Sequence, residues 1–232
     1  MLRRTCPVCH HKPLTVTKDY LVCYHCHTFN KRLNFLQRPL AWATQRGWWL
    51  RLPILIYVIW VLLQLLPHMR DLYIGLQNRR DVLWLLDFGI HELGHILFKP
   101  FGEFMYIAGG SLFQCLFPLM GVVAFWQIRW YFASAMCWPW LGMNLFQVAD
   151  YAADARARLL PLASLGGDYD KAHDWYQILS RLNRLDQDQI IAYHLRQAGV
   201  ATMVIGIVLG SILVWYMGLY GFYRVLDRHR KA

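Results

Sequence analysis

The chain has few charged residues, and glutamate is the scarcest of the charged types. Charged residues make up 16% of its 232 residues, whereas an ordinary soluble domain carries about 25%. Glu92 and Glu103 are the only glutamates among 14 acidic residues, against 24 basic ones. Hydrophobic residues reach 57%, which excludes a disordered chain because so much apolar surface requires burial. Glycine and proline occur without a period, which excludes a collagen-like chain. The composition does not fit a plain soluble enzyme.

Cysteine occurs six times, and four of the six form two CxxC pairs, Cys6 with Cys9 and Cys23 with Cys26. Two such pairs at this separation are typical of a zinc ribbon, in which four thiolates close a tetrahedron around a structural Zn²⁺ ion. The segment 15–22 between the pairs predicts a short β-hairpin. Two disulfides in an extracellular segment are the alternative. Histidine offers substitutes for one of the cysteine ligands, at His10, His11, His25 and His27.

Long apolar runs begin after the first 51 residues. Five such runs leave too little polar chain to wrap them in a soluble core. We therefore expect an all-α multipass membrane protein with about four or five transmembrane or re-entrant helices and a small N-terminal zinc-ribbon module. The second run carries ionisable residues and is the least certain span. The runs cover residues 52–67, 82–98, 104–126, 130–151 and 200–220.

The changes in composition also predict how the chain is divided. A basic linker that adjoins the membrane follows the ribbon, and a polar helical loop separates the membrane core from the last transmembrane helix and its basic tail. The expected segments are the ribbon at 1–30, the linker at 31–51, the core with the HExxH helix at 52–151, the loop at 152–199, and the last helix with the tail at 200–232.

The distribution of basic residues predicts sidedness. The basic N-terminus and its reduced cysteines favour a cytoplasmic ribbon; the bacterial inner membrane is what the resemblance described below implies. Five simple spans would put the basic C-terminus on the other side, so either one segment is re-entrant or the tail is an exception. Gly109-Gly110 within 104–126 marks the segment that we expect to be bent or re-entrant. In the polar loop, Asp186 predicts the start of a helix that runs to about Gln197 and ends at Gly199.

One motif carries chemistry, because His91-Glu92-Leu93-Gly94-His95 is an HExxH sequence. On a helix, residues i and i+4 share a face, so His91 and His95 can reach one metal ion. Glu92 can then take a proton from a water whose pKa the metal lowers to about 7, and pass it to a leaving amine. Ionisable groups inside an apolar run are costly and mark function. The alternative is a polar patch whose hydrogen bonds are made by neighbouring helices.

A catalytic zinc ion needs a third protein ligand and an open fourth position. We expect Asp154 to be the third ligand, ahead of His173 and Asp174, which are its rivals. Asp150 lies one turn before Asp154 and is a further candidate. Asp87 lies one turn before the motif and is better placed to hold an imidazole ring than to bind the metal.

Each candidate third ligand also has a structural interpretation. Asp154 can form an ion pair with Arg158 four residues later. His173 can cap a helix over 174–182, where Asp174 is favourable in the first turn. A closed site with His173 as a fourth ligand would favour a binding protein over an enzyme.

These residues resemble the site-2 protease class of intramembrane zinc metalloproteases. In that class HExxH lies in one transmembrane helix and an aspartate in a later helix completes the site. The resemblance matches His91, Glu92 and His95 to the family motif, with Asp154 where the family's aspartate would fall. The chain departs from the family after Asn144, because the family's downstream proline and its Leu-Asp-Gly sequence are missing.

The chain is also similar to uncharacterised bacterial multipass proteins that combine a zinc ribbon with short motifs. In this sequence the motifs are HExxH at 91–95, Gly109–Ser111, Asp154–Arg156 and His173–Trp175. Gly109–Ser111 has two interpretations, an exposed strand that pairs with an extended substrate or a patch of small residues for helix packing. Gln114 is a candidate donor to a developing oxyanion.

The resemblance implies a membrane-embedded zinc metalloprotease that hydrolyses membrane or membrane-proximal substrates, with Glu92 as general base. It implies two zinc ions, one catalytic and one structural, and a lipid bilayer and a membrane-protein or peptide substrate as partners. The alternative is a non-catalytic assembly protein whose ribbon docks a partner. Nucleic acid is a less favoured partner, because basic residues beside a first span serve topology and lipid headgroups equally well.

Overall fold

A computed structural model of the chain gives its fold. The part of the chain that the structure describes consists of residues 6, 8–9, 14–17, 20–23, 30–43, 47–69, 82–160 and 173–229. Cys26 and the histidines near the cysteine pairs, His10, His11, His25 and His27, lie outside the described residues.

The N-terminal module is a small antiparallel sheet followed by a short helix. Its described strands β1 (Thr15–Thr17), β2 (Tyr20–Val22) and β3 (Asn30–Arg32) are ordered β1-β2-β3, which confirms the hairpin predicted over 15–22. Helix α1 spans Gln37–Ala43. Asn34 Oδ1 accepts the backbone N–H of Gln37 at 2.9 Å, and Gln37 Oε1 accepts that of Asn34 at 3.3 Å. This reciprocal pair stabilises the start of α1.

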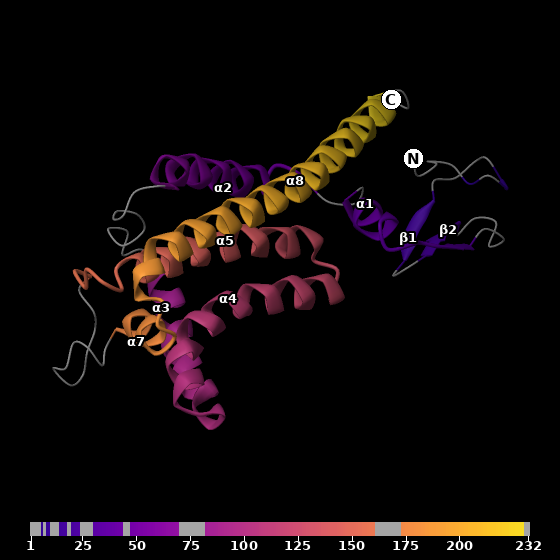
Figure 1. The fold of residues 1–232 in the computed structure, drawn as a ribbon. Coiled ribbons are helices and arrows are strands. Elements are labelled where there is room, and N and C mark those ends of the chain that lie inside the picture. Colours follow the sequence, from indigo (N-terminus) through magenta and orange to yellow (C-terminus); the bar gives the residue numbers. More distant parts are fainter. Residues whose placement is uncertain are drawn as a thin grey trace.

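Long helices form the rest of the described fold. Helices α4, α5 and α8 lie side by side, α2 covers α8, and α3 and α7 gather at one end of this layer (Figure 1). The helices are α2 (Leu52–Leu65), α3 (Val82–Phe98), α4 (Glu103–Gln127), α5 (Tyr131–Ala153), α7 (Asp174–Arg181) and α8 (Asp188–His229). Single 3₁₀ turns cover Leu66–Met69, Lys99–Phe101 and Leu185–Gln187.

Within the described residues, three helical segments are long and apolar enough to cross a membrane: Leu52–Met69, Glu103–Gln127 and Leu185–Phe222. Helix α3, with 17 residues, is shorter than these segments. Helix α5 has 23 residues but packs between α4 and α8, and buries much of its surface against them. A helix enclosed by protein does not need a wholly apolar surface. The expectation of several apolar membrane helices is therefore supported for three segments.

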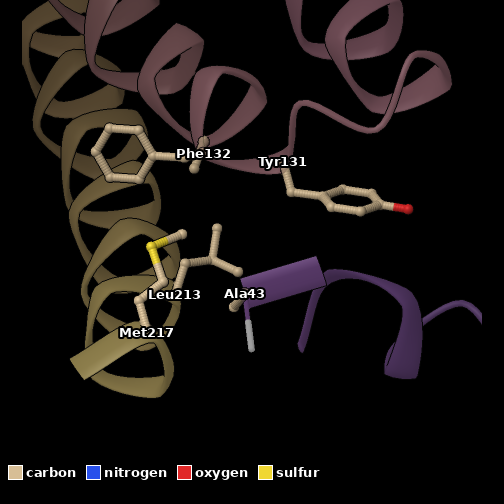
Figure 2. Packing of buried hydrophobic residues seen from close by; sticks show 6 residues of the cluster. Ala43, Tyr131, Phe132, Leu213 and Met217 are labelled. Carbon is tan, nitrogen blue, oxygen red and sulfur yellow. The ribbon is translucent and has the colours of Figure 1, made fainter. Parts of the chain in front are cut away.

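A cluster of buried side chains joins the N-terminal module to the helices. Ala43 at the end of α1 packs against Tyr131 and Phe132 at the start of α5, and against Leu213 and Met217 of α8 (Figure 2). The sheet and the C-terminal part of α8 therefore lie at one end of the helical layer, and α3 and α7 lie at the opposite end (Figure 1). We call these the sheet end and the α7 end.

Helix α8 corrects one prediction about the polar loop. It begins at Asp188 and continues through Gly199 to His229, so the predicted helix end at Gly199 is wrong. Gly199 is a packing residue instead, because a Cβ there would lie 3.0 Å from the carbonyl oxygen of Gly142 and 2.9 Å from the ring of Phe146. Small residues of this kind let two membrane helices approach closely. The expected boundary at 199 falls inside one continuous helix.

Helix α4 corrects a second prediction. It runs unbroken through Gly109-Gly110, so the described backbone has neither the re-entrant break nor the exposed strand that these glycines suggested. A Cβ at Gly109 would lie 2.7 Å from the carbonyl oxygen of Gly94 on α3. Gly94 and Gly109 therefore permit the backbones of α3 and α4 to touch.

Candidate metal centre

His91 and His95 lie on the face of α3 that meets α4, opposite Gly110. A Cβ at Gly110 would lie 2.5 Å from His91 Nε2 and 2.6 Å from His95 Nε2. Gly110 therefore lets the backbone of α4 come close to both ring nitrogens, and no side chain of its own stands before them. The side chains of the two histidines are 12% and 11% exposed, so their ring nitrogens are largely enclosed by protein.

The hydrogen bond of His95 fixes which nitrogen carries its proton. His95 Nδ1 lies 2.7 Å from the backbone carbonyl oxygen of Tyr106. A carbonyl oxygen only accepts hydrogen bonds, so Nδ1 is the donor. In the neutral ring, Nε2 then presents a lone pair to the space beside Gly110. A metal-binding imidazole has this arrangement, with one nitrogen held by an acceptor and the other free to coordinate.

A chain of amide side chains gives His91 the same tautomer. Asn144 Nδ2 donates to the carbonyl oxygen of Trp140 at 3.1 Å, so Asn144 Oδ1 is an acceptor. It accepts from Gln114 Nε2 at 2.9 Å. Gln114 Oε1 is therefore turned toward His91 Nδ1, which lies 3.1 Å away and must donate. His91 Nε2, like that of His95, presents a lone pair.

The same assignment follows from Asp87, at the other side of the amide chain. Asp87 is 2% exposed, and its carboxylate accepts from Trp140 Nε1 at 2.8 Å and from Gln147 Nε2 at 3.0 Å. Gln147 Oε1 must then be an acceptor, and Gln114 Nε2 donates to it at 2.8 Å. Asp87 was expected to hold an imidazole, and these bonds link it to His91 through Gln147 and Gln114. Both N–H groups of Gln114 are used here, which leaves neither for an oxyanion.

Asp174 supplies the carboxylate closest to the two ring nitrogens. Its Oδ2 lies 3.1 Å from His91 Nε2 and 3.3 Å from His95 Nε2. Burial raises the pKa of Asp174, whereas hydrogen bonds from the two imidazoles, which form only when their Nε2 atoms are protonated, lower it below the ordinary value. Asp174 is the first residue of α7, where the helix dipole also favours a negative charge.

Two lone pairs and a carboxylate oxygen thus converge on the space beside Gly110. Such atoms repel one another unless a proton or a metal cation lies among them. Ligand atoms about 2.0–2.2 Å from a tetrahedral zinc ion lie about 3.3–3.6 Å apart. The 3.1 and 3.3 Å separations of Asp174 from the imidazoles are close to this range. The donor types and these two separations are therefore suited to a metal ion.

Glu92 completes the group on its open side. One oxygen of Glu92 and one nitrogen of each histidine lie within 4.8 Å of one another, so His91, Glu92 and His95 could hold a metal ion. Unlike the histidines, Glu92 is exposed. An exposed carboxylate beside a metal position has room for a water molecule and for a substrate group.

Asp154, which was expected to be the third ligand, makes its contacts elsewhere. It is 1% exposed, and its oxygens accept the backbone N–H groups of Leu159 at 2.8 Å and Leu160 at 3.0 Å. Its Oδ2 also lies 3.2 Å from His173 Nε2. The described contacts bring Asp174, rather than Asp154, to His91 and His95. That Asp154 binds the metal remains a prediction, without support from these contacts.

His173 is the N-cap of α7, as its structural interpretation predicted. Its Nδ1 accepts the backbone N–H of Tyr176 at 3.2 Å, so Nε2 is the proton-bearing atom that faces Asp154. Burial lowers the pKa of His173, although Asp154 acts in the opposite direction. Asp150, the remaining candidate, accepts from Arg196 Nη2 of α8 at 2.8 Å.

The N-terminal cysteines form a second group. Sulfur atoms of Cys6, Cys9 and Cys23 lie within 4.8 Å of one another, so these residues could also hold a metal ion. Cys9 Sγ and Cys23 Sγ lie 3.7 Å apart, farther than the roughly 2.05 Å of a disulfide bond. The backbone N–H of Val8 donates to Cys6 Sγ at 3.4 Å, a contact that stabilises a thiolate. Cys26, the expected fourth ligand, lies outside the described residues.

The sequence predicted the local parts of this centre and missed the amide chain. Asn144, Gln147 and Asp87 stand out as polar residues in apolar runs, which was the available signal. No family model, no curated protein and no solved structure matches the chain. Its function must therefore be inferred from the geometry of its own sites.

Proposed function

We propose that the chain is a membrane-embedded zinc metallopeptidase that hydrolyses peptide bonds of membrane or membrane-proximal substrates. The observation that carries this proposal is the convergence of His91 Nε2, His95 Nε2 and Asp174 Oδ2 on the space beside Gly110. Two imidazoles and one carboxylate, with a fourth position open, are a donor set of catalytic zinc sites.

Asp174 takes the place that the sequence assigned to Asp154. Support comes from the separation of its Oδ2 from both imidazoles, 3.1 and 3.3 Å, and from its place at the start of α7. Asp154 already accepts two backbone N–H groups and contacts His173. A carboxylate with these contacts would have to give them up in order to bind the metal.

Each residue has a distinct task in this proposal. The zinc ion would act as a Lewis acid that lowers the pKa of water and polarises a carbonyl group. Glu92 would take the proton of the attacking water and carry it to the leaving amine. Tyr106 and Gln114 would orient the imidazoles of His95 and His91 through their Nδ1 atoms.

The alternative is a non-catalytic membrane assembly protein whose ribbon docks a partner. A closed site with His173 as a fourth ligand would favour that alternative. Both nitrogens of His173 are engaged, one with Tyr176 and the other with Asp154. The exposed carboxylate of Glu92 adjoins the position that remains open. Both observations favour the enzyme.

We also propose that the sheet end faces the cytoplasm of a bacterial cell and that the metal centre lies toward the opposite face of the inner membrane. The first 51 residues carry nine Lys or Arg and one acid, Asp19, which by the positive-inside rule favours a cytoplasmic ribbon. The end of α8 lies at the sheet end as well (Figure 1). Helices α2, α4, α5 and α8 make an even number of passages along the layer, so the chain returns to the side on which it began. The basic tail then lies on the same side as the ribbon, as the positive-inside rule requires.

A comparison of the two glutamates tests the catalytic proposal. Glu92→Gln in the purified full-length protein should keep two zinc ions per chain. Its turnover of a peptide library, measured after reconstitution into lipid, should fall by about 10²–10⁴-fold because the general base is lost. Glu103→Gln is the matched control, since Glu103 is 74% exposed and only pairs with Arg181 at the surface. Unchanged cleavage by Glu92→Gln would refute the assignment.

The third ligand is tested by metal content. Asp174→Ala should reduce bound zinc from two ions per chain to one, as measured by elemental analysis after dialysis, because the remaining two imidazoles bind zinc weakly. Retention of both ions would contradict the role given to Asp174. A wild-type protein that carries zinc at both sites and cleaves no peptide would favour the assembly protein.

A further inference from the structure

We infer that Asp154 and His173 form a positioning pair, which holds the first turn of α7 so that Asp174 reaches the metal. This inference rests on the proposed metal centre and adds to it the residues that set the place of its third ligand. It also gives a function to two short sequence motifs, Asp154–Arg156 and His173–Trp175.

Asp154 is itself held firmly by the backbone. It lies at the C-terminal end of α5, and its two oxygens accept the N–H groups of Leu159 and Leu160 from the turn that follows. The residue is 1% exposed, so these hydrogen bonds do not compete with water. Asp154 is therefore a fixed point at the end of a long packed helix.

His173 connects this fixed point to α7. Its Nδ1 accepts the N–H of Tyr176, so its Nε2–H is directed at Asp154 Oδ2, 3.2 Å away. Both side chains are 0% exposed. The ring of Tyr151 lies 4.6 Å from the His173 ring and covers it. One imidazole thus caps the helix and joins it to α5.

Asp174 is the next residue in the chain, so its position follows directly from that of His173. The backbone N–H of Asp174 donates to the hydroxyl of Tyr151 at 2.9 Å, and its carboxylate turns toward the imidazoles of α3. Helix α7 has two further polar attachments, Trp175 Nε1 to Ser111 Oγ at 3.1 Å and, at its far end, an ion pair of Arg181 with Glu103. The side chains of that ion pair are 38% and 74% exposed, so it contributes little, and the buried contacts at the first turn hold α7 most firmly.

The consequence is a measurable coupling between Asp154 and the metal, although Asp154 does not touch it. Loss of a residue that orients a metal ligand lowers affinity by about 10- to 100-fold. His173→Asn keeps a side-chain oxygen that can cap α7 at Tyr176 but is too short to reach Asp154. Asp154→Asn cuts the same contact from the other side while it keeps the shape of the side chain.

The test measures the zinc dissociation constant of the full-length protein in detergent by competition with a chelator. His173→Asn and Asp154→Asn should each weaken zinc binding at the histidine site by about 10- to 100-fold, while the ribbon keeps its zinc. Asp188→Asn is the matched control, because Asp188 is an equally buried carboxylate that pairs with Arg156 instead. This control should leave the zinc affinity unchanged.

A double-mutant comparison separates positioning from general loss of structure. In an Asp174→Ala background, His173→Asn should cause no further loss of zinc affinity, because the pair acts through Asp174. An equal loss in that background would overturn the inference, and so would an unchanged affinity in both single variants. If one single variant does not fold, the other decides. If wild-type protein binds zinc only at the ribbon, the proposed function fails, which is a different result.

Discussion

The two ligand groups of this chain differ in how they are built. The cysteine group spans Cys6 to Cys23 around one small sheet, so its ligands are close in sequence as well as in space. The histidine group brings together two imidazoles from α3 and, in the proposed centre, the carboxylate of Asp174, which is 83 residues beyond His91. A local group depends on one turn and one hairpin. A distant group depends on the packing of several helices, so it responds to changes far from the metal.

The surroundings of the two groups differ as well. With Cys26 as the predicted fourth ligand, the cysteine group would leave no position for a substrate, which is typical of a structural site. At the histidine site, Glu92 is exposed and Gly110 places no side chain before the ring nitrogens. Three variants sharpen this comparison, ordered by their expected effect on the histidine site.

Gly110→Ala should have the largest effect. The new methyl group would lie within 2.6 Å of both ring nitrogens, so the imidazoles must move away from Asp174 and the metal is lost. We expect one zinc ion per chain instead of two, by elemental analysis, and no turnover. Gly89→Ala on α3 is the control, because a Cβ there meets nothing within 4 Å. A Gly110→Ala protein that holds two zinc ions would contradict the position given to the metal.

Asp87→Asn should have an intermediate effect. The asparagine can accept from only one of the two donors, Trp140 Nε1 or Gln147 Nε2, so the amide chain behind His91 loses part of its order. We expect zinc at the histidine site to bind about tenfold more weakly in the chelator competition. Unchanged affinity would mean that the tautomer of His91 is set by Gln114 alone.

Cys6→Ser should have no effect on the histidine site. The variant removes one thiolate from the cysteine group, so the ribbon is expected to release its zinc and its sheet to become less stable. The histidine site, at the other end of the helical layer, should keep its ion and its affinity (Figure 1). Loss of zinc from both groups in this variant would show that the two regions are coupled.

The same contrast explains what the sequence could predict. The HExxH helix, the hairpin between the cysteine pairs and the N-cap at His173 are set by neighbours in the chain, and the structure contains all three. The choice between Asp154 and Asp174 depends instead on α7 folding back against α3 and α4. No sequence pattern within either segment predicts that contact.

Glycine caused two errors for a related physical reason. Gly199 was expected to end a helix and Gly109-Gly110 to break one, because glycine is flexible in isolation. Both lie within continuous helices, α8 and α4, where the absence of a side chain permits close helix contacts. In a membrane bundle, glycine marks a close contact with a neighbouring helix more often than it marks the end of its own helix.

The amide chain behind His91 has a directional consequence. If the Gln114 amide rotated by half a turn, its N–H₂ would face His91 Nδ1–H, and its oxygen would face the acceptors of Asn144 and Gln147. Three hydrogen bonds at about 1 kcal/mol each would be lost together. Such a misoriented state would be populated at about one per cent or less. The proton of His91 is therefore held in place by a one-way chain of hydrogen bonds that begins at the carbonyl of Trp140 on another helix.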